Sequence, residues 1–370
     1  MTHKVIQWAT GYTGLFALKY ILHNPNLQLL GLKFFSDRKE GVDAGVIAGM
    51  TPIGVPATQD TEALLNLDAD CVIYMPGDPD LGDPTDAGSR TQELFKAVLP
   101  ILESGKNVVT VLTSLIAPQF IGPEGEKCVE ELERACRIGG STFFGTGFEP
   151  GFMADVLPLC LAGTCAEVHS VRSYEILDYS DYDKLETLQS VGLCVKPELP
   201  AGRSPSALLS VWRSVPYFVA RGIGAVLDEV RVVADFRPAP ETFATHRGIT
   251  VEKGSIAGLR FAVEGLVDGD PVIAVEHISR MRPDIALEWP NLLPHGGYRI
   301  EIEGSNPVNA DFHLALPGGT GNSFADAMAS TAARAVNAVD FVCEAPPGVK
   351  TFFDLPMITG RHSFRRRTGC

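Results

Sequence analysis

Short apolar runs alternate with helix-like segments along the first 150 residues of the chain. Residues 14–22, 89–105 and 129–140 place apolar side chains at helical spacing. Between them lie continuous apolar runs of the kind found in strands that are buried on both faces. These runs are residues 5–9, 27–35, 70–75, 107–112 and 141–145. The alternation predicts a doubly wound α/β domain with a parallel sheet.

The pattern changes beyond residue 150, where single apolar and polar residues alternate. Residues 166–177, 261–281 and 297–304 have this period of two, which indicates antiparallel strands with one polar side. The sequence DGD at 268–270 predicts a hairpin turn within the second of these segments. Helical spacing returns in the alanine-rich segment 323–345. We therefore expect a second domain that is built around antiparallel strands and is followed by a helix.

The composition is that of an acidic globular protein. Of the 370 residues, 45% are hydrophobic and 21% are charged, and the formal net charge is −14. Nucleic acid requires a basic footprint, so we do not expect it as a partner. The eight cysteines include no C-x-x-C pair, which argues against a zinc site or a disulfide framework. No signal-peptide pattern and no apolar stretch of membrane-spanning length is present, so we expect a cytoplasmic protein with no membrane partner.

The sequence ATGYTG at residues 9–14 joins the first predicted strand to the first predicted helix. Glycines at 11 and 14 would leave backbone N–H groups bare at the positive end of that helix, where dinucleotide pyrophosphates bind. Alanine replaces the usual first glycine, but the strand–turn–helix context still favours dinucleotide binding over a tight turn alone. The predicted cofactor-binding residues are Thr10, Gly11, Tyr12, Thr13 and Gly14, together with Met75 and Pro76 after a later strand.

The end of the second predicted strand bears on the choice between NAD and NADP. An acidic residue about 20 positions after the glycines usually binds the ribose hydroxyls of NAD, and Asp37 fits that place. Ser36, Arg38 and Lys39 surround it, and a hydroxyl with two cations suits the 2′-phosphate of NADP. We therefore predict NADP, with NAD as the alternative; a solvated turn is also compatible with these residues.

Six blocks of sequence together carry a family resemblance. In chain order they are VIQWATGYTGLFAL (5–18), SDRKEGVDAGVIAG (36–49), GKNVV (105–109), GTGFEPGFMADVLPL (145–159), YEILDYSDYD (174–183) and APPGVKTFFDLPMITGR (345–361). They resemble the 2,4-diaminopentanoate dehydrogenase and native amine dehydrogenase family, relatives of dihydrodipicolinate reductase. The resemblance implies an N-terminal Rossmann domain, a C-terminal α+β domain with an open, mostly antiparallel sheet, a nicotinamide cofactor in the cleft, and a homodimer. It also implies that the family interconverts an amine and a ketone with hydride and ammonia, or reduces related C=N bonds.

The resemblance gives expected domain bounds. We expect a Rossmann domain at 1–150 and a substrate-binding and dimerisation domain at 151–322. Residues 323–370 would form a helix and tail that pack back towards the Rossmann domain.

The chain departs from the family at the catalytic glutamate. Relatives have a stretch resembling NVISTCEELSYP, which here reads NVVTVLTSLIAP (107–118), so the two glutamates fall on Thr113 and Ser114. A threonine hydroxyl can hydrogen-bond a carbonyl or imine, but it is not a useful base near neutral pH. The resemblance therefore places Thr113 at the catalytic position, and the loss of the carboxylate argues against true amine dehydrogenation.

A second departure lies in GTGFEPGF (145–152), where relatives typically have asparagine before the proline and this chain has Glu149. The turn follows a predicted strand, at the sheet edge where ligands collect in open α/β folds. Our hypothesis is that Glu149 lies in the cofactor–substrate cleft and partly replaces the missing carboxylate. The alternative is that Glu149 caps a helix starting near Gly151.

Other polar residues are weaker candidates. Tyr174 and Tyr179, in a segment that also holds Glu175 and Tyr182, could donate a proton to a substrate oxygen, although interface tyrosines fit the same pattern. His277 could equally be the outward-facing residue of a strand, with no part in a site. We find no metal-ligand spacing and no nucleophile motif, so we predict neither a metal site nor covalent catalysis.

Apolar residues near the predicted cleft suggest a substrate with hydrocarbon bulk, although core residues would have the same composition. The predicted substrate-contacting residues are Leu112, Ser114, Phe148, Phe152 and His295, the last on a loop rich in proline and glycine. We therefore predict an NADP-dependent oxidoreductase that transfers hydride to or from a C=O or C=N carbon. A true amine dehydrogenase with a rearranged proton relay and a non-catalytic NADP-binding regulator are the alternatives.

Overall fold

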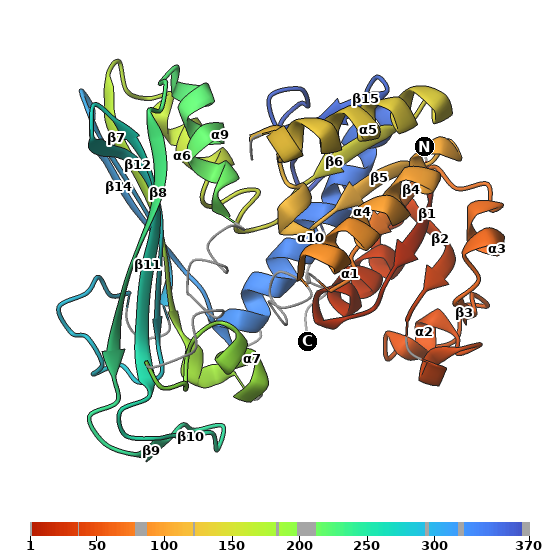
Figure 1. Cartoon of the computed structure of the whole chain (residues 1–370). Helices are drawn as coiled ribbons and strands as arrows, with labels where there is room; N and C mark the ends of the chain where they lie inside the picture. The colour runs from red at the N-terminus through yellow and green to blue at the C-terminus, as the bar shows by residue number, and fades with distance from the viewer. Residues whose placement is uncertain are drawn as a thin grey trace. The chain divides into compact units, whose positions relative to one another are not determined.

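The computed structural model describes residues 2–35, 37–77, 87–120, 123–182, 185–197, 212–292, 296–316 and 322–364. The chain forms two compact units. Unit 1 holds the described residues within Met1–Gly77, Gln92–Phe148 and Met328–Cys370, and unit 2 those within Asp78–Thr91 and Glu149–Ala327. Figure 1 labels the elements of both units.

A parallel sheet forms the centre of unit 1. In its described residues the sheet has seven strands: β1 (His3–Trp8), β2 (Leu27–Lys33), β3 (Ala57–Thr58), β4 (Cys71–Tyr74), β5 (Asn107–Thr110), β6 (Thr142–Gly145) and β15 (Gly348–Lys350). Their order is β15-β6-β5-β4-β1-β2-β3, and all neighbouring pairs are parallel. The order reverses between β1 and β4, and ligands bind at the carboxyl ends of the strands at such a switch point.

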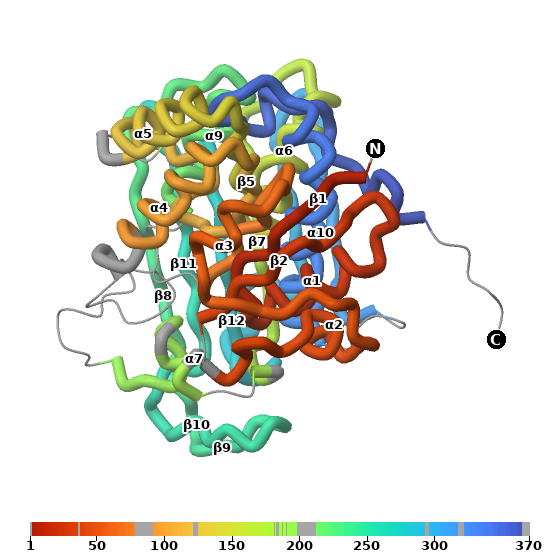
Figure 2. The backbone as a smooth tube through the Cα atoms, turned by 90° about the vertical axis from the view of Figure 1, so that its right-hand side faces the viewer, coloured from red at the N-terminus to blue at the C-terminus, as the bar shows by residue number. Residues whose placement is uncertain are grey.

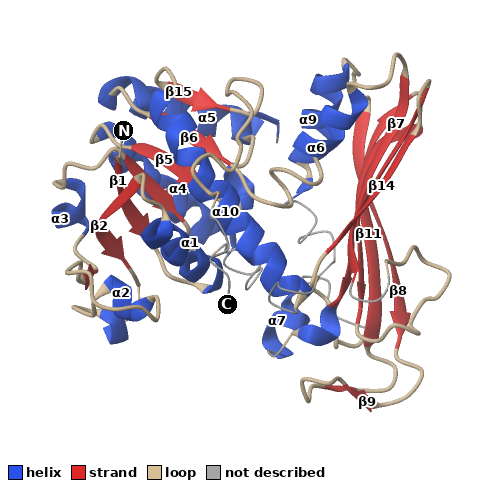
Figure 3. Cartoon of the chain, turned by 180° about the vertical axis from the view of Figure 1, so that it is seen from behind, coloured by secondary structure: helices blue, strands red, loops and turns tan. Residues whose placement is uncertain are grey.

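Helices cover both faces of the parallel sheet. One apolar cluster joins it to α1 (Tyr12–His23), α2 (Ala44–Ile47) and α10 (Ser323–Glu344). A second joins the other face to α3 (Thr61–Leu65), α4 (Ala87–Glu103) and α5 (Pro123–Gly139). Successive side chains of β1 point to opposite faces of the sheet, since Val5 belongs to the first cluster and Ile6 to the second. The predicted Rossmann-type, doubly wound fold is confirmed, and Figure 3 shows these helices and strands from behind.

Unit 2 is built on a six-stranded sheet. The strands, counted over the described residues, are β7 (Val168–Asp178), β8 (Glu229–Pro238), β11 (Ile256–Val267), β12 (Asp270–Arg280), β13 (Gly296–Gly304) and β14 (Val308–His313). In the order β14-β13-β7-β12-β11-β8, only β7 and β12 pair in parallel. The expected mostly antiparallel sheet is therefore confirmed.

Beside the sheet, the described residues of unit 2 form three helices and a small strand pair. The helices are α6 (Val156–Ala162), α7 (Leu185–Ser190) and α9 (Ser214–Ile223). Helices α6 and α9 pack against each other and against the sheet. The pair β9 (Phe243–Ala244) and β10 (Thr250–Val251) lies beyond one end of β8 and β11 (Figure 2).

The predicted hairpin joins β11 to β12. Val267 pairs with Asp270, and the two residues between them, Asp268 and Gly269, have φ values of 53° and 86°. Two consecutive positive φ values are those of a type I′ turn, whose twist matches that of the flanking strands.

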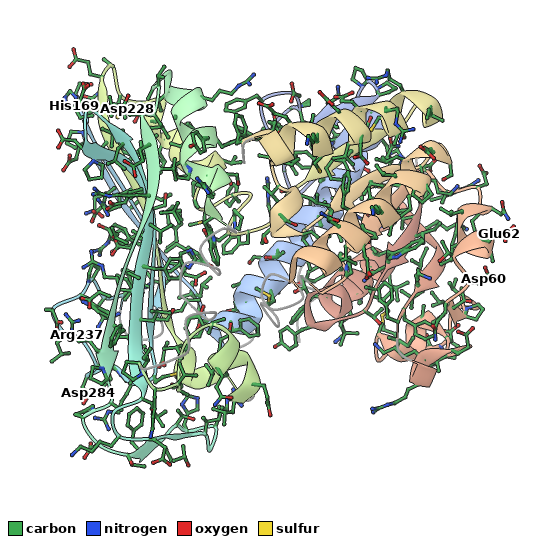
Figure 4. The ribbon with its side chains drawn as sticks, in the orientation of Figure 1. Asp60, Glu62, His169, Asp228, Arg237 and Asp284 are labelled. Carbon is green, nitrogen blue, oxygen red and sulfur yellow. The ribbon has the colours of Figure 1, made fainter. Side chains whose placement is uncertain are left out.

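The two faces of the unit 2 sheet differ in their polar contacts. Glu276, on β12, has a side chain only 1% exposed, and it accepts hydrogen bonds from Arg172 Nη1 at 2.9 Å and Arg260 Nε at 2.6 Å. Its neighbour His277 points to the opposite face, because successive residues of a strand alternate. At one end of the same sheet lie the labelled side chains of His169 and Asp228 (Figure 4).

The C-terminal segment beyond α10 supplies the edge strand of the unit 1 sheet, since β15 pairs with β6. Buried residues of α10, among them Ala335 and Val339, belong to the unit 1 core. Among the described helices, none combines the length and apolar character that a membrane crossing needs.

Candidate functional site

The turn between β1 and α1 has an alanine where the usual motif has its first glycine. Ala9 has φ 83° and is 5% exposed. A side chain is disfavoured in this left-handed region, which glycine adopts readily. The backbone thus has the conformation of the glycine motif although the residue is alanine.

Gly14 lies where the helix comes closest to the strand. A Cβ atom on it would lie 2.7 Å from the Ala9 carbonyl oxygen and 3.3 Å from Gln7 Nε2. Gln7 is fully buried, and its Nε2 donates to the Ala9 carbonyl at 3.0 Å and to the Gly14 carbonyl. Gln7 was not selected in the sequence analysis, yet its side chain stabilises the turn by hydrogen bonds to two backbone carbonyls.

The start of α1 has the properties of an anion site. Gly11 is the N-cap, so no cap side chain occupies the helix end, and the first turn contains no acidic residue. A Cβ on Gly11 would meet nothing within 4 Å. Thr10 precedes this cap, and Tyr12 and Thr13 open the helix. A phosphate group fits there, because helix N-termini bear positive partial charge and backbone N–H donors.

A cation from the end of β2 reaches this turn. Lys39, in the 3₁₀ segment Asp37–Lys39, donates from Nζ to Thr10 Oγ1 at 2.7 Å and to the Thr10 carbonyl at 3.1 Å. Arg38 is exposed. Ser36 lies outside the described residues.

The other predicted residues of unit 1 follow the ends of neighbouring strands. Met75 and Pro76 are buried just after β4. Thr113 and Ser114 lie in the short 3₁₀ segment Thr113–Leu115, where Leu112 is the N-cap.

Phe148 ends this part of unit 1. Phe152 belongs to unit 2. His295 lies outside the described residues.

Glu149 is not the helix cap that one hypothesis required. Helix α6 begins at Val156 rather than near Gly151, and Asp155 is its N-cap. The Asp155 carboxylate accepts from the N–H of Val156 at 2.6 Å and from that of Gly151 at 2.8 Å. The capping alternative is therefore wrong, because an aspartate closer to the helix performs that role.

The Glu149 side chain instead belongs to a buried cluster in unit 2. It is 4% exposed, and its Oε2 accepts from Trp212 Nε1 at 2.8 Å and lies 3.4 Å from His277 Nε2. Its Oε1 is buried and has no hydrogen-bond partner among the described residues. Burial raises the pKa of Glu149, and the negative charge of Glu175 adds to this; His277 and Trp212 oppose it without cancelling it.

His277 lies between two carboxylates. Its side chain is 3% exposed, and Nδ1 lies 3.2 Å from Glu175 Oε1, on the opposite side of the ring from Glu149. Burial alone would lower the pKa of His277, but the charges of Glu149 and Glu175 outweigh it and raise the pKa to about 10. The outward strand position considered for His277 is therefore wrong.

Two tyrosines complete the cluster around Glu175. Tyr298 donates to Oε2 at 3.0 Å and Tyr179 donates to Oε1 at 3.3 Å. Tyr179 also stacks on Tyr182, with ring centroids 4.8 Å apart. Burial alone would raise the pKa of Glu175, but His277 and the two tyrosine hydroxyls outweigh it and lower the pKa.

Tyr174 does not join this cluster. It neighbours Glu175 on β7 and therefore points to the other face of the sheet, where its hydroxyl donates to Glu301 Oε2 at 3.0 Å. Of the two tyrosines proposed from the sequence, only Tyr179 lies with Glu149.

Sequence reasoning missed Trp212 and Tyr298 and undervalued His277. The one usable signal was His277 itself, a titratable residue within an apolar strand pattern. Nothing in the sequence linked it to Glu149, which lies 128 positions earlier.

Donor atoms of Glu149, Glu175 and His277 lie within 4.8 Å of one another, a spacing that a metal ion could also use. The two ring nitrogens, however, point to different carboxylates, so a single ion on one nitrogen would leave the other contact unchanged. A positively charged imidazolium between two carboxylates accounts for both contacts without a metal, through an ion pair with Glu149 and a hydrogen bond with Glu175. We therefore interpret the cluster as an array of ion pairs.

Comparison with known proteins gives the same family as the sequence blocks. Residues 152–367 match the model of the 2,4-diaminopentanoate dehydrogenase C-terminal domain. An amine dehydrogenase from Streptomyces virginiae is 32% identical over 361 residues, 96% of each chain. A 2,4-diaminopentanoate dehydrogenase from Acetoanaerobium sticklandii is 26% identical over 281 residues, 73% of this chain and 72% of the relative.

Solved structures share the fold. That of an amine dehydrogenase from Mycobacterium smegmatis has a TM-score of 0.72 at 19% identity and covers 98% of this chain and 99% of its own. A scyllo-inositol dehydrogenase from Lactobacillus casei, solved with NAD(H) and scyllo-inositol, has a TM-score of 0.51 at 13% identity. The match covers 92% of this chain and 89% of that structure's chain.

Proposed function

Since the chain belongs to the 2,4-diaminopentanoate dehydrogenase and amine dehydrogenase family, and is an oxidoreductase of that family, we propose that it interconverts a small amine and its ketone. In this proposal the turn between β1 and α1 binds a nicotinamide nucleotide, and Glu149 is the acid–base group. The observation that carries the proposal is the buried Glu149 carboxyl group, one oxygen of which has no hydrogen-bond partner among the described residues.

Glu149 supplies a function that the family glutamate would otherwise supply. The sequence has Thr113 at that place, and a hydroxyl cannot give and take protons near neutral pH. A carboxyl group whose pKa burial has raised can do both. Glu149 is thus a candidate for the acid–base residue of a rearranged site.

The bound nicotinamide would supply or accept the hydride, and the residues of the chain would handle the protons. For amination, Glu149 Oε1 gives its proton to the hydroxyl group of the carbinolamine that ketone and ammonia form. The C–O bond breaks with its electron pair on oxygen, water leaves, and the nitrogen lone pair forms the C=N bond. Proton transfer of this kind contributes about 10²–10⁴-fold to a rate.

The test is the rate of reduced-nucleotide oxidation with a panel of small ketones, with and without ammonium chloride. We expect turnover that requires ammonia and that falls by about 10²-fold or more in Glu149→Gln. Glu186→Gln is the matched control, because Glu186 is an exposed glutamate on α7. If Glu149→Gln and Glu186→Gln both reduced ketones without ammonia at the same rate, the result would contradict the proposal and favour a simple carbonyl reductase.

For the cofactor we propose NADP, with its 2′-phosphate recognised at the end of β2. The exposed Arg38 and the contact of Lys39 with Thr10 support a cationic site there. We expect Arg38→Ala to weaken NADPH binding in calorimetry about tenfold and to leave NADH binding unchanged, because only NADPH carries the additional phosphate. Tighter binding of NADH than of NADPH by the unmodified chain would instead assign NAD.

The homodimer implied by the resemblance stays a prediction. Light scattering during size-exclusion chromatography would give a mass near twice 39.7 kDa for a dimer. A mass near 39.7 kDa would rule it out under those conditions.

A further inference from the structure

Glu149 is one end of a linear array of three charged side chains. The His277 ring lies between Glu149 Oε2, at 3.4 Å from Nε2, and Glu175 Oε1, at 3.2 Å from Nδ1. The Nδ1 contact is a hydrogen bond, whereas Nε2 has no hydrogen-bond partner among the described residues and faces Glu149 as an ion pair. Two carboxylates this close to one ring favour its positively charged form. The geometry therefore fits an imidazolium.

Two aromatic rings, which also contact each other, pack against that imidazolium. The Phe261 ring is stacked on it with centroids 4.6 Å apart and an interplanar angle of 5°, and the Trp212 ring lies 4.3 Å away at 56°. Aromatic faces attract cations and exclude water. The same Trp212 donates to Glu149, so the aromatic wall and the carboxyl group are linked.

The two ends of the array are not equivalent. Glu175 receives three contacts, from His277, Tyr179 and Tyr298, which together fix both of its oxygens. Glu149 receives two contacts, both on Oε2, and its Oε1 has no partner among the residues that the structure places. Glu175 is therefore held in place by its contacts, whereas Glu149 has one oxygen that a ligand could contact.

We propose that Glu175 and His277 are positioning residues that hold the Glu149 carboxyl group by Oε2 and leave Oε1 to exchange a proton with the substrate. This inference rests on the proposed function of Glu149. Glu175 fixes the charge and orientation of His277, and the His277 cation in turn limits how strongly Glu149 holds its proton. Tyr179 and Tyr298 keep Glu175 ionised by donating to it.

The charged state of His277 can be measured without turnover. In ¹⁵N-labelled protein, long-range ¹H–¹⁵N spectra distinguish an imidazolium from either neutral tautomer, and His277→Gln identifies the signal by its loss. We expect both nitrogens of His277 to be protonated from pH 6 to 9. His169, exposed near the start of β7 (Figure 4), is the matched control position, and its signal should stay in place in His277→Gln. A neutral His277 at pH 7.5 would overturn the inference even if the enzyme is active.

The second readout is the pH profile of amination. Protonated Glu149 is the required form, so the rate falls as pH rises through the pKa of Glu149, and this fall is the alkaline limb of the profile. Loss of the His277 cation removes an interaction that favours the ionised carboxylate. His277→Gln should therefore move the alkaline limb to higher pH by about 1–3 pH units. His169→Gln should leave it in place, and an unmoved limb in folded His277→Gln would contradict the inference.

Tyr298→Phe is a milder variant in case His277→Gln does not fold, because it removes one hydroxyl donor and no charge. We expect it to raise the pH at which the His277 signal titrates, since Glu175 stays ionised and has one donor fewer to share its negative charge with His277. An unchanged His277 titration in a folded Tyr298→Phe protein would contradict the anchoring role. Absence of turnover on every amine and ketone, together with a protonated His277, would instead contradict only the proposed function.

Discussion

Gly11 and Gly14 have separable physical reasons to be glycine. A side chain on Gly14 would meet the Ala9 carbonyl oxygen at 2.7 Å, which is backbone and cannot move away cheaply. A side chain on Gly11 would meet nothing within 4 Å, but it would fill the space in front of the α1 N-terminus. We therefore expect Gly14 to matter for folding, through the close helix–strand contact, and Gly11 to matter for the approach of a phosphate.

This separation predicts opposite outcomes for two alanine variants. Gly14→Ala should lower the free energy of unfolding by about 1–3 kcal/mol, because the helix must move away from β1. Gly11→Ala should cost less than about 1 kcal/mol but weaken nucleotide binding. Urea unfolding and calorimetry measure the two effects. Equal loss of stability in both variants would contradict the assignment.

The sequence was sufficient to predict the glycine turn because its spacing and context are local. It was not sufficient to predict the role of Gln7, since a glutamine in a strand looks like any polar residue. Only the fold places its amide against the carbonyls of Ala9 and Gly14. Local motifs are visible in a sequence, whereas the side chains that support them from beneath are not.

At the scale of elements, the loop between β6 and α6 depends on one aspartate. Asp155 is 4% exposed and accepts from the N–H groups of Gly151 and Val156. It therefore both starts α6 and fixes the segment that carries Glu149.

Asp155→Ala should lower the free energy of unfolding by about 1–2 kcal/mol, the usual cost of losing a helix cap. Asp155→Asn keeps an acceptor oxygen and should lose less. Chemical denaturation with circular dichroism gives both values. A stability of Asp155→Ala equal to that of the unmodified chain would mean that water replaces the carboxylate.

Element prediction succeeded where periodicity was strong. Five of the seven described strands of the parallel sheet and the β11–β12 hairpin were predicted, whereas the short edge strands β3 and β15 were not. Strand β8 was not predicted either, because its exposed residues include Val232, Val233 and Phe236. An edge strand with apolar residues in solvent lacks the contrast between a buried and a polar face on which the prediction relies.

At the scale of the whole molecule, the cluster is assembled from three distant parts of the chain. Glu149 follows β6, Glu175 lies on β7 and His277 on β12, and β7 and β12 are paired only in the folded sheet. The sequence offered Glu149 as a candidate and the structure supplied its partners. Such a site cannot be predicted without the strand order.

The cluster also predicts how stability depends on pH. Because the pKa of His277 is raised in the folded chain from 6.5 to about 10, its stabilising contribution is full below about pH 6.5 and is lost as pH rises towards 10. The raised pKa of Glu149 acts in the same direction. We expect the free energy of unfolding to fall between pH 7 and 10 in urea titrations, and the difference from His277→Gln to narrow over that range. If the difference in free energy of unfolding between the unmodified chain and His277→Gln stayed constant over this range, the pKa of His277 would not differ between the folded and unfolded chains, which would contradict the prediction.

Neighbouring positions of β12 carry opposite arrangements of charge. His277 is a cation between two anions on one face, and Glu276 is an anion between the cations Arg172 and Arg260 on the other. A slip of one residue would exchange the faces and set glutamate among glutamates and histidine beside arginines. Charges on both faces of β12 therefore disfavour misaligned pairing of this strand, so the same side chains that form the two ion clusters also select the correct register.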